Sequence, residues 1–161
     1  MAVEESTPGL EHETDELTGF GTRPVLLRDL EEAVEPDSPP GTLGLLDLHG
    51  FLDRFGHIEG EAHLGSVARH LYEALEGARF YRPRAHELAV LVEAPAHEAE
   101  RLLSLAASAV NAQLGQQKVA LLFCLVVLPD EASDPLAALR LAESRQMLRR
   151  RPRERRLYPR G

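Results

Sequence analysis

Two carboxylates are the residues of this chain best placed to do chemistry. Asp47 lies near the end of the short apolar run Leu43–Leu48, which stands between breakers and predicts a buried strand. Glu87 follows the turn of a predicted hairpin over residues 79–93. A carboxylate at the end of a buried strand needs a partner, a metal ion or solvent. Together the two could bind one divalent cation, with waters and phosphates completing its shell.

The hairpin that contains Glu87 also contains three arginines: Arg79, Arg82 and Arg84. Pro83 has no N–H to donate to a sheet ladder, which favours a turn or an edge at this point. The arginines could bind a phosphate or an acidic partner. The alternative is that they are solvated, or that Arg82 or Arg84 forms a salt bridge with the two carboxylates.

Other catalytic or metal-binding patterns are weak or absent in the sequence. Four histidines could suggest zinc, but their spacing matches no standard site: His49, His57, His63 and His86. The single cysteine, Cys124, lies in an apolar run and is predicted to be a buried structural thiol. Dinucleotide-binding, Walker and HExxH motifs are missing. We therefore predict no resident metal and no cofactor.

Charge is distributed unevenly along the 161 residues, whose net charge is −8. Residues 1–40 contain eleven acids and two arginines, whereas residues 140–161 contain nine arginines and two acids. The basic end is either a solvated tail or a docking arm, and the acidic head argues against DNA as its partner. The length predicts one domain. With no signal peptide and no transmembrane segment in the sequence, we predict a cytoplasmic protein.

The predicted elements combine helices, strands and one hairpin. Residues 1–14 are polar and acidic and are predicted to be disordered. The most apolar segment, Lys118–Leu128, predicts a central strand, and Leu157-Tyr158 could form a short last one. Four helices are predicted: from Thr22 to about Ala33, over 60–76, over 95–114, and from Pro135 to about Arg150 with Pro152 ending it. This order predicts an α+β fold with helices on the faces of a sheet.

Five segments, in the same order and with similar spacing, resemble motifs of the GGDEF, or diguanylate cyclase, family. They are Asp15-Glu-Leu-Thr-Gly-Phe20, Leu45-Leu-Asp-Leu-His-Gly-Phe51, Gly56-His-Ile-Glu-Gly-Glu-Ala-His-Leu64, Arg84-Ala-His-Glu-Leu88 and Val119 to Pro129. The resemblance implies a palm-like, mostly antiparallel sheet flanked by helices. Active members of the family join two GTP molecules into cyclic di-GMP at a dimer interface, with two metal ions at each site.

The same resemblance shows where this chain departs from the family pattern. It places Asp47 and Glu87 at carboxylate positions of the family site, and Glu61 at a guanine-reading position. The signature G-G-D/E-E-F is replaced by Arg84-Ala85-His86-Glu87-Leu88, so both glycines and one acid are lost. Glycine lets the backbone approach a nucleotide where a Cβ would clash. The segment after Phe51 is also shorter and lacks the guanine-reading Asn.

We therefore predict a GGDEF-like domain over residues 15–150 that is not an enzyme, between the acidic head 1–14 and a basic tail 151–161. We expect a regulatory or scaffolding protein in bacterial signalling that binds another protein, with a homodimer as an alternative. The residues expected to mediate binding are Arg79, Arg82, Arg84, Arg149, Arg150 and Arg151. Two further functions stay open: a non-catalytic sensor of GTP or cyclic di-GMP, and a residual nucleotide cyclase.

Overall fold

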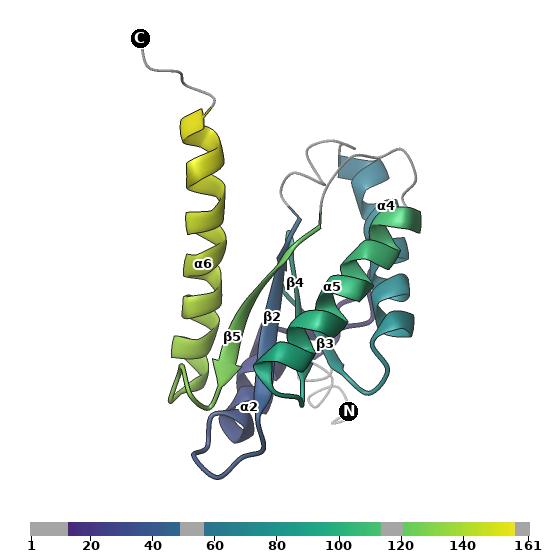
Figure 1. The fold of residues 1–161 in the computed structure, drawn as a ribbon. Coiled ribbons are helices and arrows are strands. Elements are labelled where there is room, and N and C mark those ends of the chain that lie inside the picture. Colours follow the sequence, from purple (N-terminus) through teal and green to yellow (C-terminus); the bar gives the residue numbers. More distant parts are fainter. Residues whose placement is uncertain (1–12, 49–56, 114–120, 157–161) are drawn as a thin grey trace, which may run out of the picture.

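The computed structural model describes residues 13–48, 57–113 and 121–156. For residues 57–59 and 150–156 it describes the backbone alone. The fold is α+β, as predicted: in the described ranges, a mixed five-stranded sheet is flanked by four helices (Figure 1). The elements are β1 (Gly21–Thr22), α2 (Arg23–Ala33), β2 (Gly41–Asp47), α4 (His57–Ala74), β3 (Arg79–Arg84), β4 (Glu87–Val92), α5 (Ala96–Gln113), β5 (Phe123–Leu128) and α6 (Pro135–Arg156).

The strands lie in the order β1-β3-β4-β2-β5. The short strand β1 is parallel to β3, and the other neighbours are antiparallel. The hairpin β3–β4 is confirmed, but β1 was not predicted. The prediction that Lys118–Leu128 forms a central strand was wrong, because among the described strands β5 pairs only with β2 and lies at an edge of the sheet. An apolar run shows that both faces of a strand are covered, and it does not show how many strands lie beside it.

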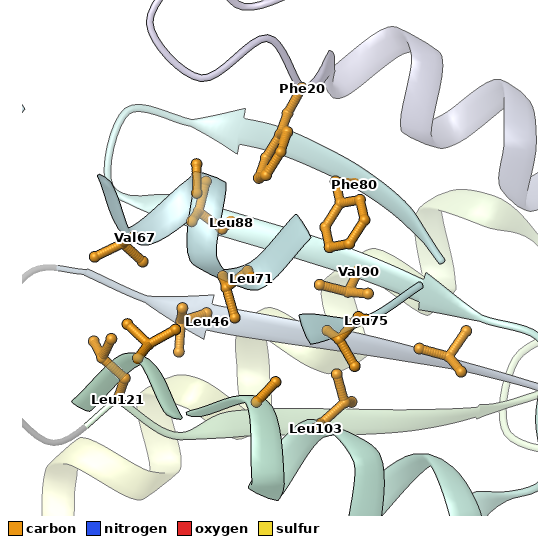
Figure 2. Close-up of a cluster of buried hydrophobic side chains, with 14 of the residues drawn as sticks. Phe20, Leu46, Val67, Leu71, Leu75, Phe80, Leu88, Val90, Leu103 and Leu121 are labelled. Atoms are coloured by element: carbon orange, nitrogen blue, oxygen red, sulfur yellow. The ribbon is translucent and has the colours of Figure 1, made fainter. Parts of the chain in front are cut away.

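The sheet separates two hydrophobic clusters, and the period-2 alternation of side chains decides which residue faces which cluster. Leu46 packs with α4 and α5, as Figure 2 shows for this cluster, in which side chains of several strands meet those of both helices. Leu43 and Leu45 point to the opposite face, where α2 and α6 cover the sheet. Asp47 continues the alternation of Leu43 and Leu45, which places it on the α2/α6 face.

The predicted helices are confirmed, with one boundary corrected. Helix α6 runs through Pro152 to Arg156, so the prediction that this proline ends the helix was wrong. A proline inside a helix removes one main-chain bond, and the arginines around it are good helix formers. At the other end of the chain, Glu13 and Thr14 are not part of a disordered head. Thr14 bridges Gly21, and the Thr22 N–H donates to the Glu13 carbonyl at 3.1 Å.

Two predictions fall where the structure makes no statement. The rest of the acidic head and the short strand at Leu157-Tyr158 lie outside the described residues. Within the described part of the chain, none of the helices is both long and apolar enough to cross a membrane.

Candidate functional site

The two carboxylates singled out by the sequence lie side by side. Asp47, the last residue of β2, is directly opposite Glu87, the first residue of β4. Residues paired in this way have their Cβ atoms about 5 Å apart and on the same face of the sheet. The Leu48 N–H donates to the His86 carbonyl at 2.7 Å, which ties the end of β2 to the hairpin turn. The pair therefore faces α2 and α6.

Helix α6 covers this pair and supplies an ion-pair partner for the hairpin. The Gln146 side chain is buried and donates to the Leu45 carbonyl at 2.6 Å, two residues before Asp47. One turn earlier on α6, Glu143 Oε2 lies 3.2 Å from Arg84 Nε and 3.3 Å from Arg23 Nη1. A single carboxylate thus bridges an arginine of the hairpin and an arginine at the start of α2.

Glu87 is a buried acid whose carboxyl has few polar partners. The residue is only 8% exposed. Among the described residues, its Oε1 atom has no hydrogen-bond partner, and a guanidinium atom, Arg84 Nε, lies 3.8 Å away. Burial, and then the Glu143 charge, raise the pKa of Glu87 to about 7; Arg84 and Arg23 lower it, and Asp47 raises it further. Near neutral pH, this carboxyl therefore holds a proton much more readily than an exposed glutamate does.

A metal site gains no support from the acids that lie here. Among the described residues, no group of three or more His, Cys, Asp or Glu side chains could hold a metal ion. Within that part of the chain, Asp47 and Glu87 are thus a pair of acids and not a larger cluster of possible metal ligands.

The hairpin turn is built without glycine. Ala85 and His86 form a two-residue turn, and neither has a positive φ. Two-residue hairpins usually need positive φ values to match the twist of their strands. Here the pairing instead shifts register between Tyr81 and Arg84, which accommodates a turn of ordinary handedness. Arg84 and Ala85 are both exposed at its tip.

The three hairpin arginines do not form one cluster, because each has its own internal acceptor. Arg82 is mostly buried, with Nη1 3.2 Å from both oxygens of Asp15 and Nη2 2.7 Å from the Ala85 carbonyl. Partial burial opposes ionisation of Asp15, but hydrogen bonds from Thr18 and the charge of Arg82 lower its pKa overall. Arg79 pairs at 3.6 Å with Asp29, which also accepts from the Tyr81 hydroxyl at 2.7 Å. Arg84 is engaged by Glu143.

Other predicted site residues lie elsewhere. Glu61 is exposed on α4, across the sheet from the carboxylate pair. Arg149 is exposed on α6 and donates to the Phe123 carbonyl at 3.2 Å, on the edge of β5. The side chains of Arg150 and Arg151 lie outside the described set. Cys124 is buried, as predicted, and burial raises the pKa of its thiol.

Sequence reasoning missed Glu143 and Gln146. Helical spacing from Leu139 also places Met147 near the buried side of α6, but Met147 is 53% exposed. The buried stripe of α6 instead runs through Leu139 and Ala142. Glu143 and Gln146 each lie four residues after one of these positions, so strict helical spacing was the signal that could have found them.

The chain belongs to the GGDEF domain family. The family model described as diguanylate cyclase, GGDEF domain, matches residues 12–150. Among solved structures, the GGDEF domain of DgcB from Caulobacter crescentus, in complex with c-di-GMP, is 20% identical with a TM-score of 0.68, covering 87% of this chain and 88% of that one. The FimX GGDEF domain from Pseudomonas aeruginosa is 18% identical with a TM-score of 0.63, covering 82% and 90%.

A third similar structure contains a protein partner. Diguanylate cyclase SiaD from Pseudomonas aeruginosa, in complex with its activator SiaC, is 22% identical with a TM-score of 0.57. The match covers 78% of this chain and 53% of the SiaD chain, so this chain spans about half of that relative. Among curated proteins, none matches this chain significantly. At these identities the structures establish the fold.

Proposed function

We propose that this protein is a catalytically inactive GGDEF domain that acts as a regulatory or scaffolding module in bacterial signalling by binding another protein. The observation that supports this best is the state of the carboxylate pair. Glu87 is buried beneath α6, and the positive charge next to it, Arg84, is already paired with Glu143 of that helix.

Catalytic inactivity follows from what the family chemistry requires. Two metal ions need several ionised carboxylates in an accessible cleft. Here the sequence supplies two acids at this place, and one of them, Glu87, is largely buried, with 8% of its surface exposed. The signature glycines are replaced by Arg84 and Ala85, and the turn has adapted to residues with a Cβ.

A protein partner is supported by two features. SiaD, a relative by fold of which this chain covers 53%, was crystallised in complex with a protein activator, SiaC. The described surface of this chain also includes large apolar side chains on α6, with Met147 53% and Leu148 58% exposed. Exposed apolar residues beside arginines are typical of protein-binding surfaces.

The decisive assay for inactivity is incubation of the purified protein with GTP and Mg²⁺ or Mn²⁺, followed by chromatographic measurement of cyclic di-GMP. We expect no product above a protein-free control. Product that forms with the wild-type protein and disappears in both Asp47→Ala and Glu87→Ala variants would refute the proposal and establish a residual cyclase.

A nucleotide sensor without turnover is a second candidate, favoured by the retained Asp47–Glu87 pair at the strand ends. Calorimetry and thermal unfolding against GTP and cyclic di-GMP test it, because a ligand that binds only the folded state raises the unfolding temperature. If neither nucleotide releases heat or shifts unfolding at millimolar concentration, the sensor function is rejected.

A further inference from the structure

The outer edge of β5 presents a short row of main-chain groups. Along β5, the main-chain N–H and C=O groups of successive residues point alternately towards β2 and away from it. The residues on one side of this alternation are Phe123, Leu125 and Val127. In an antiparallel pair, alternate residues direct both their N–H and C=O groups to the same side. The groups of these three residues therefore point away from β2, on the side of β5 where the described residues place no further strand.

Charged side chains occupy this row in place of a neighbouring strand. Arg149 donates to the Phe123 carbonyl at 3.2 Å, and Arg145 donates to the Leu125 carbonyl at 2.5 Å. Glu131 Oε1 accepts from the Val127 N–H at 2.8 Å and also binds Arg145. The hydrogen bond from Arg145 lowers the pKa of Glu131 to about 2, so this carboxylate stays charged. Unpaired strand edges invite pairing, and charged side chains are one way to limit it.

The Phe123–Leu125 half of this edge lies in a groove of about 510 Å³ between α5 and α6. Arg145 and Arg149 line it from α6, and the polar residues Ser104, Ser108 and Asn111 line it from α5, together with the acid Glu100. Within the described part of the chain, Asn111 Oδ1 is buried and has no hydrogen-bond partner. The groove thus has main-chain carbonyls on its floor, polar side chains on one wall and guanidinium donors on the other.

We propose that this groove is the docking site for an extended, acidic segment of a protein partner. The segment adds along β5, and its main-chain N–H groups replace the arginines on the Phe123 and Leu125 carbonyls. Its acidic side chains then bind Arg145 and Arg149. Val127 stays bound to Glu131, which limits the added strand to the first half of β5.

The chemistry of the groove favours a segment that has both an extended backbone and acidic side chains. Main-chain acceptors repeated every second residue fit an extended backbone, as in other cases of strand addition to a sheet edge. Charge selects an acidic segment, because Arg149 is exposed and its helix continues into a sequence rich in arginine up to Arg156. The acid on the opposite wall, Glu100, disfavours acidic side chains there and so orients the segment towards α6.

The probe is a blocked heptapeptide of alternating valine and glutamate, titrated into the full chain and followed by NMR. We expect saturable binding with shifts centred on Phe123 and Leu125. Arg149→Glu should weaken binding roughly tenfold or more, as for other close charge pairs. Arg140→Glu, an equal charge change at an exposed position of α6 outside the groove lining, is the matched control and should leave binding nearly unchanged.

A second peptide, N-methylated at alternate residues, keeps every charge but loses main-chain donors. It should not bind, and this test needs no variant of the protein. Equal binding of the N-methylated peptide, equal binding of a valine-lysine peptide, or no binding of the acidic peptide at millimolar concentration would each overturn the proposal. Stronger Arg149-dependent binding of a single-stranded RNA would also overturn it.

This inference rests on the proposed protein-binding role, but the two can fail separately. Formation of cyclic di-GMP would refute catalytic inactivity and leave the peptide titration as it stands. A silent cyclase assay with no peptide binding would reject the groove alone.

Discussion

Glu87→Gln should remove a pH-dependent loss of stability. Glutamine has the shape of the protonated acid and cannot ionise. In the wild-type protein the pKa of Glu87 is raised from 4.5 to about 7, mainly by burial and by Glu143. The folded state therefore holds a proton that the unfolded chain has lost between these values. The stabilisation is fully present below pH 4.5 and is lost as the pH rises through about 7.

The size of the effect follows from the difference between the two pKa values. Each pH unit corresponds to about 1.4 kcal/mol, so the wild-type free energy of unfolding should fall by about 3 kcal/mol, relative to the variant, between about pH 4.5 and pH 8. The variant should match the wild type near pH 5 and be more stable at pH 8. Since Glu87 is only 8% exposed, solvent screening reduces this figure little.

Urea unfolding at several pH values measures this difference directly, because the midpoint and slope give the free energy of unfolding. Glu93→Gln is the matched control, since Glu93 is an exposed glutamate just after the same strand. Its pH dependence should follow that of the wild type. Parallel stability curves for wild type and Glu87→Gln between pH 5 and 8 would refute the reasoning, because they would mean that Glu87 is ionised without cost.

Two further substitutions test how the hairpin is held. Arg82→Ala should cost about 2–3 kcal/mol of unfolding free energy, because it removes the side-chain donor to the Ala85 carbonyl and the ion-pair partner of Asp15, which keeps only its bonds from Thr18. Arg84→Ala, at a side chain 51% exposed, should cost about 1 kcal/mol or less. Equal urea midpoints for the two variants would contradict this. Tyr81→Phe should lower the free energy of unfolding by about 1.5 kcal/mol or more, because the hydrogen bond to Asp29 is lost. Tyr72→Phe, at a 61% exposed residue, should change it by no more than about 0.5 kcal/mol. Thermal unfolding in which the two variants behave alike would argue against a structural role for the Tyr81–Asp29 bond.

Local patterns in the sequence were sufficient to predict most of the elements. A short apolar run between breakers predicted the strand that ends at Asp47, and alternation after a turn predicted the hairpin that contains Glu87. Apolar stripes predicted the helices. The two-residue strand β1 was missed because it is too short to show any alternation. The edge position of β5 was missed because strand neighbours depend on contacts far apart in sequence.

The candidate site was predicted only in part, for the same reason. Asp47 and Glu87 could be found because each ends or begins a strand of recognisable pattern. Glu143, which forms ion pairs with the arginines next to this pair, is 56 positions further along the chain than Glu87 and belongs to no motif. The sequence also grouped Arg79, Arg82 and Arg84 as one binding surface. Their separate acceptors come from the N-terminal segment, α2, the turn and α6.

Helix α6 links the proposed silent site to the proposed groove. Glu143 and Gln146 hold it against the hairpin and β2, while Arg145 and Arg149 hold it against the edge of β5. These four residues occupy fewer than two turns of one helix, so a displacement of the arginines acts on the same short segment that contains Glu143. In the proposed docking mode, a partner strand on β5 changes the contacts of the helix that buries Glu87. In the proposed function, this route couples the hairpin that contains Glu87 to the binding of a protein.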